Sequence, residues 1–576
     1  MSTIDWTILV GTLLFIVLYG VWKTRGASNL NSYLKGNNEA KWWGIGISIM
    51  ATQASAITFL STPGQAYSDG MRFIQFYFGL PIAMIILSVT FVPIFYRLKV
   101  FTAYEYLETR FDLKTRTLAA LLFLIQRGLA AGITIYAPAI ILSTLLNWNL
   151  TLTNIFIGLL VIIYTVSGGT KAVTQTQKHQ MVVMMGGMIL AGVLVLNMLP
   201  ENIAFIDAMH IAGNMGKLNM VNFDFSLNDR YNFWTGTTAA LFLFLSYFGT
   251  DQSQVQRYLS GKSLSQSRLG LIMNGLLKVP MQFIILFIGV MVFVFYQFNQ
   301  PPVFFNKVEL DKLKISDYAD DLKTLENQHQ IIHKEKTVHI YQLVDAEEAK
   351  DIKQIALYKS KVNKSNEELM NISNEVKTLV KKNNPSAETN DKDYIFMTYV
   401  MNHLPQGVIG LLFAVMFCAA MSSTASELNA LASTTTIDIY KRSVKKSGND
   451  RHYLLSSKAF TFLWGILAIT FATSASLFEN LIQAVNLLGS LFYGTILGIF
   501  IVAFYFKKIR SNAVFYGAIF AELAVVLIHY LNTLENTPKW IEMGYLWYNV
   551  IGCLLVVLFG SIIQLTQNKN HKITLT

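Results

Sequence analysis

Residues 46–64 read GISIMATQASAITFLSTPG, and this stretch decides the fold. It is apolar enough to lie in a membrane, yet four polar side chains crowd its middle: Thr52, Gln53, Ser55 and Thr58. Polar groups at membrane depth are costly and usually face the interior of a helix bundle. One interpretation is ordinary packing between helices through small polar residues. The other is a helix that is interrupted here to line a binding site.

The composition of the chain places it in a membrane. The 576 residues have a mean hydropathy of +0.41, and only 14% are charged, against about 25% in soluble domains. The formal net charge of +11 would suit nucleic acid in a soluble protein. Here Lys and Arg concentrate in short loops between apolar runs, which is typical of membrane topology. We therefore expect an all-α polytopic membrane protein that contacts lipid and binds no nucleic acid. Cys418 and Cys553 lie in apolar runs and indicate no disulfide framework.

About 13 apolar segments are long enough to cross a bilayer as helices. Alternation of period two is absent, and backbone polar groups in lipid must be satisfied locally, so helices are the expected form. The segments fall at 6–22, 43–62, 72–96, 117–146, 152–168, 180–199, 234–250, 271–299, 406–436, 454–477, 481–505, 512–531 and 545–566.

The basic residues predict the orientation of the chain. No Lys or Arg precedes the first apolar run and Lys23 follows it, so this run is expected to be an uncleaved span that begins outside. An outside start places nearly every basic loop inside, including KRSVKKSGNDR at residues 441–451 and KKIR at 507–510. We expect an integral protein of the cytoplasmic membrane, with its N-terminus outside and its C-terminus inside.

One charged segment interrupts the series of spans. Residues 303–393 are dense in Lys, Glu and Asp and have few aromatic residues. Their helix formers and spaced apolar residues predict a helical insert. It follows an outward-going helix, so it is expected outside, between helices 1–8 in residues 1–302 and helices 9–13 in 394–576. It is either a solvated insert without chemistry of its own, or a gate or docking surface for an unknown partner over the outer mouth.

A second polar interruption lies five spans after the first. Residues 244–258 read FLSYFGTDQSQVQRY, with hydroxyls and glycine near membrane depth. Two broken helices in corresponding positions are typical of an inverted repeat of five plus five helices. We expect the first repeat at about 42–199 and the helix at 6–22 outside this core. The pair favours interrupted helices over plain packing.

A third interruption is CAAMSSTASELNAL at residues 418–431. On a helix, Ala419, Ser422, Ser423 and Ser426 share one face. That face permits close approach of another backbone and offers uncharged oxygen ligands. Such ligands, with carbonyls freed where a helix unwinds, suit a monovalent cation such as sodium. Packing of small residues is the alternative.

These stretches resemble the sodium:solute symporter family. The motifs that carry the resemblance are ATQASAITFLSTPGQAY, IYTVSGGTKAV, GTDQSQVQRYLSGKS, AAMSSTASELNALASTTTIDIYKR and VNLLGSLFYGTILG, and it covers roughly residues 5–300 and 394–510. SAITFLSTPG and IYAPAI are nearer the iodide, vitamin and monocarboxylate branch than the sugar branch. The resemblance implies the leucine-transporter fold and alternating access driven by a sodium gradient.

The resemblance also implies a sodium site. Its ligands would be the carbonyls of Ala51, Ala54 and Ala419 and the hydroxyls of Ser422 and Ser423. Some family members bind a second sodium through an aspartate, and Gln177 stands at that position beside Ser426. An amide supplies no charge, so we expect one ion per cycle, with sodium as the coupling ion and the sole metal, and no cofactor. Glu427 could change that expectation, but a buried carboxylate paired with a Lys or Arg of the cytoplasmic side is favoured.

The solute is expected at the midplane between the two broken helices. Arg127 falls inside a long span and should face the interior, where its planar guanidinium suits a carboxylate. The alternative is that Arg127 lies nearer the inner interface and snorkels or pairs with a loop carboxylate. Tyr77 replaces a sugar-binding glutamate of the sugar carriers, which weakens a hexose assignment. The candidate lining is Gln53, Ser55, Thr58, Tyr77, Arg127, Phe244, Tyr247, Phe248, Lys278 and Gln483.

The predicted function is sodium-coupled symport of a small organic solute or anion of monocarboxylate, vitamin or sialate type. A sodium/sugar symporter of hexose or inositol type is the alternative, and a solute sensor built on the transporter fold is a further one. An enzyme is not expected, because an enzyme needs clustered acids, histidines or a nucleophile with a base. His179 and Asp251 are single residues at helix ends.

Overall fold

The computed structural model describes residues 1–24, 30–146, 148–385, 387, 389–474, 481–534 and 542–573. These residues are helical, and within them the sole β-type pairing is an isolated bridge between Ala40 and Gly261. The helices up to the insert are α1 (Thr3–Thr24), α2 (Leu30–Lys35), α3 (Trp42–Gln53), α4 (Ala56–Asp69), α5 (Gly79–Val89), α6 (Phe91–Leu98), α7 (Glu105–Arg110), α8 (Leu113–Leu146), α9 (Leu150–Asn197), α10 (Phe205–Asn214), α11 (Ala240–Gly249), α12 (Gln252–Leu259) and α13 (Leu264–Phe298).

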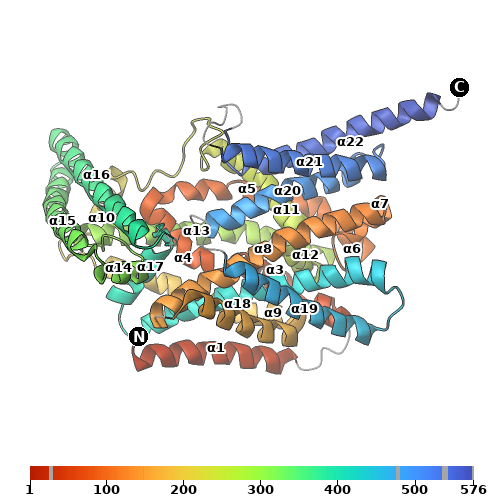
Figure 1. Cartoon of the computed structure of the whole chain (residues 1–576), viewed down its shortest axis with the longest axis horizontal. Coiled ribbons are helices and arrows are strands. Elements are labelled where there is room, and N and C mark those ends of the chain that lie inside the picture. The colour runs from red at the N-terminus through yellow and green to blue at the C-terminus, as the bar shows by residue number, and fades with distance from the viewer. Residues whose placement is uncertain are drawn as a thin grey trace.

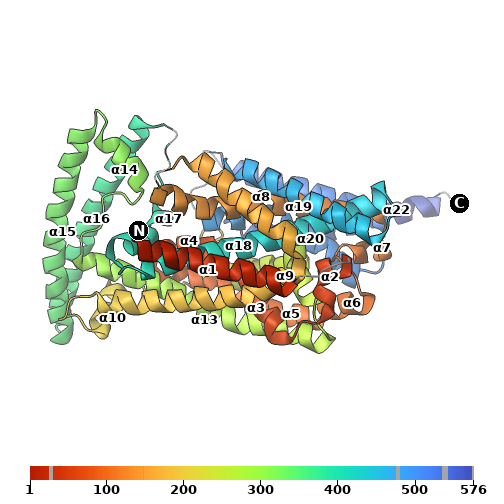
Figure 2. The same cartoon turned by 90° about the horizontal axis from the view of Figure 1, so that it is seen from below.

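The remaining helices are α14 (Lys307–Lys314), α15 (Ala319–Glu348), α16 (Ile352–Asn383), α17 (Lys392–His403), α18 (Val408–Thr434), α19 (Asp450–Ala472), α20 (Leu481–Tyr505), α21 (Ser511–Asn532) and α22 (Trp547–Ile573). Short 3-10 or π segments stand at Gly36–Asn38, Gly70–Tyr77, Thr235–Ala239 and Thr435–Val444. The bundle helices run along one common direction (Figures 1 and 2).

Nine helical stretches in the described residues are long and apolar enough to cross a membrane, and Thr3–Tyr19, Leu150–Ile163 and Thr235–Gly249 are shorter apolar helices. The all-α membrane architecture is therefore confirmed, whereas the count of thirteen spans stays a prediction. The difference has a structural reason. Several expected spans are broken or joined: α9 runs through two of them, with a kink at Gly169, where φ is 59°. The last residues of the expected span 454–477 lie outside the described part of the chain.

Both expected breaks are present. Helix α3 ends at Gln53 and α4 begins at Ala56, because Ala54 and Ser55 leave the helical conformation, with ψ of 77° and 173°. Helix α11 ends at Gly249 and α12 restarts at Gln252, and the Asp251 side chain caps α12 by accepting from the Ser253 N–H. A break frees backbone groups of the adjoining turns, which then need other partners. The polar residues that made these segments unusual therefore stand at real helix ends.

The third polar stretch lies in an unbroken helix at the centre of the bundle. Helix α18 packs against α1, α3, α4, α8 and α9. Its residues from Ser422 to Thr434 are all buried, polar ones included. A helix that is buried on all sides belongs to the core rather than to the lipid face. Its serines therefore face protein.

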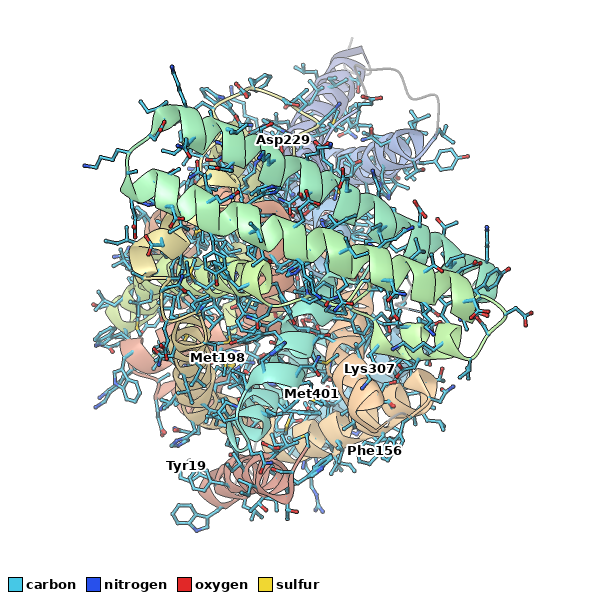
Figure 3. The ribbon with its side chains drawn as sticks, turned by 90° about the vertical axis from the view of Figure 1, so that its left-hand side faces the viewer. Tyr19, Phe156, Met198, Asp229, Lys307 and Met401 are labelled. Carbon is cyan, nitrogen blue, oxygen red and sulfur yellow. The ribbon has the colours of Figure 1, made fainter. Side chains whose placement is uncertain are left out.

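The charged segment forms a helical layer at one end of the bundle. Helices α14, α15 and α16 lie there, and α15 and α16 pack side by side across the end of the bundle (Figures 1 and 3). A separate small core, which includes Leu313, Leu322 and Val376, holds them together. The N-terminus lies at this same end and α22 carries the C-terminus to the opposite one (Figure 2). This is the arrangement expected if the insert and the N-terminus share one side of the membrane.

Candidate functional site

A central cavity of about 90 Å³ lies between the two broken helices. Side chains from both breaks form its wall, together with side chains from α8, α18 and α20. Its lining residues are Thr52, Gln53, Ser55, Ile57, Thr58, Phe76, Tyr77, Arg127, Thr134, Leu243, Phe244, Tyr247, Glu427, Ile482, Val485, Asn486 and Tyr493. The position matches the expected site between broken helices.

Most of the candidate substrate residues meet in this wall: Gln53, Ser55, Thr58, Tyr77, Arg127, Phe244 and Tyr247. Three others do not. Phe248 is buried behind the wall, with its ring centroid 4.8 Å from that of Tyr247. Lys278 is buried in α13, and its Nζ has no hydrogen-bond partner among the described residues. Gln483 accepts from Arg230 Nη1 at 2.6 Å in a separate cavity shared with Lys392.

Residues of α20 complete the wall, although neither Asn486 nor Tyr493 is among the residues predicted from the sequence. Asn486 and Tyr493 lie seven positions apart on one face of that helix. Both fall in the motif VNLLGSLFYGTILG. The helical spacing of their polar groups was the signal available. Gln483, the residue predicted from this helix, lies three positions before Asn486 and outside the cavity wall.

Arg127 is already paired in this structure. Its Nε donates to Asp251 Oδ2 at 3.0 Å, its Nη2 also donates to that oxygen, and its Nη1 donates to Glu427 Oε1 at 3.0 Å. The Tyr493 hydroxyl donates to Asp251 Oδ2 at 2.8 Å. The Arg127 side chain is 3% exposed. Arg127 therefore faces the interior as expected, and it does not reach the inner interface.

Glu427 pairs with a residue of the core. A Lys or Arg partner is expected for this buried carboxylate, and the partner in the structure is Arg127 of α8. The cluster of Arg127, Asp251, Glu427 and Tyr493, called here the arginine cluster, thus joins α8, the α11–α12 break, α18 and α20. One guanidinium faces two carboxylates in it, which is an excess of negative charge if both carboxylates are ionised.

The candidate sodium ligands come together between the first break and α18. Ser422 Oγ donates to the Ala51 carbonyl at 3.0 Å, and Ser423 Oγ donates to the Thr52 carbonyl at 3.0 Å. All five candidates, Ala51, Ala54, Ala419, Ser422 and Ser423, are at most 1% exposed. Hydroxyl and carbonyl oxygens at a broken helix are the ligand types that suit sodium in transporters.

Gln177 occupies the neighbouring position with its amide. Its Nε2 donates to the hydroxyl oxygens of Thr52, Ser422 and Ser426 at 3.1, 2.9 and 3.1 Å. Its Oε1 accepts from Ser48 Oγ at 2.5 Å. A positively polarised NH₂ group thus lies among three hydroxyl oxygens.

No group of three or more His, Cys, Asp or Glu side chains that could hold a metal ion is found in the described ranges. Carboxylate-rich clusters are what divalent cations prefer. The central polar sites are instead built mainly from hydroxyls, carbonyls and amides, and their two carboxylates, Asp251 and Glu427, face the Arg127 guanidinium.

Comparisons with known proteins agree with this geometry. The family model "Sodium:solute symporter family" matches residues 33–312 and 376–521. The sodium-coupled monocarboxylate transporter 2 of Bos taurus is 23% identical, over 97% of this chain and 84% of that protein. The sodium/sialic acid symporter SiaT of Proteus mirabilis is 25% identical, over 97% and 94%. The human sodium/iodide cotransporter is 30% identical, over 51% and 45%.

A solved structure of a Na⁺-coupled sialic acid symporter in a substrate-bound outward-open state shares the fold. The TM-score is 0.73 at 23% sequence identity, and 98% of each chain is covered. This likeness confirms the expected architecture.

Proposed function

The chain belongs to the sodium:solute symporter family, and from that premise we propose that it imports a small organic anion together with sodium. It is a sodium-coupled solute symporter, as are its monocarboxylate, iodide and sialic acid relatives. A neutral sugar of hexose or inositol type is not favoured as the solute, because these relatives are named for monocarboxylates, iodide and the acidic sugar sialic acid. The proposal that the solute is an anion rests on the residues that line the central cavity.

Arg127 is the observation that carries the anion proposal. It is the sole Lys or Arg among the described residues that line the cavity. A buried guanidinium offers paired donors that match the two oxygens of a carboxylate. Gln53, Ser55 and Thr58 supply uncharged hydrogen-bonding groups on the facing wall, and Phe244 and Tyr247 supply apolar surface. A solute with one acidic group and a small polar or apolar body fits these walls.

Sodium is proposed to bind where the first break meets α18. The carbonyls of Ala51, Ala54 and Ala419 and the hydroxyls of Ser422 and Ser423 would be its ligands. The hydrogen bonds of Ser422 to the Ala51 carbonyl and of Ser423 to the Thr52 carbonyl support this, because they hold the two proposed hydroxyl ligands against the backbone of α3 beside the break. The site adjoins Thr52 and Gln53 of the cavity wall, so filling it would order the break that also contacts the solute.

We propose one sodium per cycle. The second candidate position, formed by Ser426 and Gln177, is occupied by the Gln177 amide and has no carboxylate to offset a second charge. The protein would need no organic cofactor and catalyse no chemical conversion. The N-terminus and the insert at one end of the bundle support an outside N-terminus, an inside C-terminus and a place in the cytoplasmic membrane.

The test is uptake by purified protein in proteoliposomes. Pyruvate, lactate, nicotinate and N-acetylneuraminate are offered with an inward sodium gradient, with glucose as the neutral control and potassium as the control ion. We expect at least one of the anions to accumulate with a sodium gradient and not with potassium in its place. Glucose should not accumulate with either ion. Sodium-driven uptake of glucose with no uptake of any anion would overturn the anion assignment.

A further inference from the structure

The arginine cluster contains more negative than positive charge when both of its carboxylates are ionised. Arg127 carries one positive charge, whereas Asp251 and Glu427 bring two negative ones. An entering anion would add a third negative charge to a site buried in the membrane core. Unpaired charge there is expensive. The anion therefore needs either a free face of Arg127 or the removal of one carboxylate charge.

The two carboxylates are held very differently. Asp251 Oδ2 receives Arg127 and Tyr493, and its Oδ1 accepts from the Ser253 N–H at 2.8 Å and the Ser253 hydroxyl at 2.7 Å. Both of its oxygens are satisfied, and Asp251 does not line the cavity.

Glu427 has fewer hydrogen-bond and ion-pair partners than Asp251. It lines the cavity, and its Oε1 has a single ion pair with Arg127 Nη1 at 3.0 Å. Its Oε2 is buried and has no hydrogen-bond partner among the residues that the structure describes. The Thr134 hydroxyl lies within hydrogen-bonding reach of the carboxyl and donates to the Ala130 carbonyl at 3.1 Å. While it donates to Ala130, its oxygen lone pairs can accept from Oε2 when Oε2 carries a proton.

We propose that Glu427 is a displaceable counter-ion: the solute's acidic group replaces it on Arg127 Nη1, and Glu427 takes up one proton. The Glu427 carboxylate and a proton from the outer solution form a carboxylic acid, and no other covalent bond changes. The acid donates through Oε2 to Thr134. The net charge of the cluster is then the same before and after the solute binds. After release inside, Glu427 returns to Arg127 and gives its proton to the inner solution.

The neighbouring groups leave Glu427 as the one that titrates. Arg127 of α8 stays charged, and Asp251 of the α11–α12 break has both oxygens in hydrogen bonds or ion pairs and lies outside the cavity wall. Tyr247 of α11 and Tyr493 of α20 face the cluster and are neutral at ordinary pH. The neighbour on α9 is Gln177, which has no charge. The inference rests on the proposed function, since it requires an anion in the central cavity.

The experiment measures protons when the anion binds. Purified full-length protein in a weakly buffered sodium solution with a pH-indicator dye receives pyruvate or N-acetylneuraminate, whichever binds. We expect about one proton taken up per anion bound, and an apparent Kd that rises about tenfold per pH unit on the alkaline side. In Glu427→Gln, proton uptake should vanish while binding persists with a Kd that no longer depends on pH. Glu522→Gln, at a half-buried glutamate on α21 outside the cavity, is the control and should keep the uptake.

Each outcome decides the inference. Wild-type protein that binds the anion without taking up a proton would overturn it, and this measurement stands even if Glu427→Gln does not fold. An unchanged pH dependence in a folded Glu427→Gln would overturn it too. If no anion binds to the wild-type protein at any pH, the proposed function itself fails, which is a different result from binding without proton uptake.

Discussion

Replacing Gln177 with aspartate should give this protein a second sodium site. The Gln177 Nε2 stands 3.1, 2.9 and 3.1 Å from the hydroxyl oxygens of Thr52, Ser422 and Ser426. Aspartate is one methylene shorter, so it vacates the space of the amide nitrogen. It also adds the negative charge that the glutamine lacks. A sodium ion would then find three hydroxyl oxygens and a carboxylate around that space.

The size of the effect follows from the bonds that are lost and the ion that is gained. The amide NH₂ shares its two hydrogens among the three oxygens, and each hydrogen bond contributes about 1 kcal/mol net, so their loss costs roughly 2 kcal/mol in the absence of sodium. Sodium at about 100 times its Kd restores about 2.7 kcal/mol. The Gln177→Asp protein should thus melt well below wild type in potassium and recover most of the difference in sodium.

Transport should change in the same direction. The Hill coefficient for sodium is expected to rise from about 1 toward 2. A second coupled ion adds about 1.4 kcal/mol of driving force for a tenfold sodium gradient, which raises the limiting accumulation of the solute about tenfold. The assays are a thermal-shift titration in sodium and potassium and a sodium titration of uptake in proteoliposomes.

Gln177→Asn is the matched control. It shortens the side chain equally and brings no charge, so it should show the loss of stability without the recovery in sodium. If Gln177→Asp and Gln177→Asn respond identically to sodium, the reasoning that the amide occupies a cation position is refuted.

Other changes test separate parts of the account. Ser423→Ala removes one proposed sodium ligand and should raise the sodium concentration for half-maximal uptake about tenfold, a loss of about 1.4 kcal/mol; an unchanged sodium dependence would contradict the site. Arg127→Gln should weaken anion uptake at least tenfold, because it removes the cavity's guanidinium, and uptake at wild-type affinity would contradict the anion role. Asp438→Asn removes the charge of the carboxylate that pairs with the buried Arg116 at 2.6 Å, while the pair of Arg116 with Glu108 at 2.7 Å remains. It should cost roughly 2 kcal/mol, seen as a lower melting temperature; an unchanged melting temperature would contradict a structural role for this pair. Burial lowers the pKa of His329 in the insert to about 4, so its contribution to stability is full above about pH 6.5 and is lost as the pH falls toward 4; proteolysis of α15 and α16 should be faster at pH 5 than at pH 7.5, and equal rates would contradict this.

The sequence predicted the breaks and the cavity because both have local causes. A run of polar residues inside an apolar span, such as Thr52 to Thr58, is costly in a membrane unless these residues face a site or another helix. Because an isolated charge in lipid is equally costly, the sequence also predicted that Arg127 faces the interior of the bundle. The face of Ala419, Ser422 and Ser423 follows from helix geometry alone. These features needed no knowledge of how distant segments pack.

The partners of Arg127 could not be predicted in this way. Asp251 and Glu427 lie 124 and 300 positions away along the chain. The sequence predicts a Lys or Arg partner for Glu427 without identifying Arg127, and it shows Asp251 only as a single residue at a helix end. Their meeting depends on the tertiary packing of α8, the second break and α18, which periodicity does not encode. The number of spans depends likewise on how α3 and α4 divide and on how α9 continues through its kink.

The most direct test of the central claim is the ratio of sodium to anion carried by the protein. Radioactive sodium and the labelled anion are followed together into proteoliposomes under one set of initial rates. The account predicts that anion uptake requires sodium and that one sodium enters with each anion. Anion uptake that continues in potassium without sodium, or a ratio of two sodium ions in the wild-type protein, would contradict it.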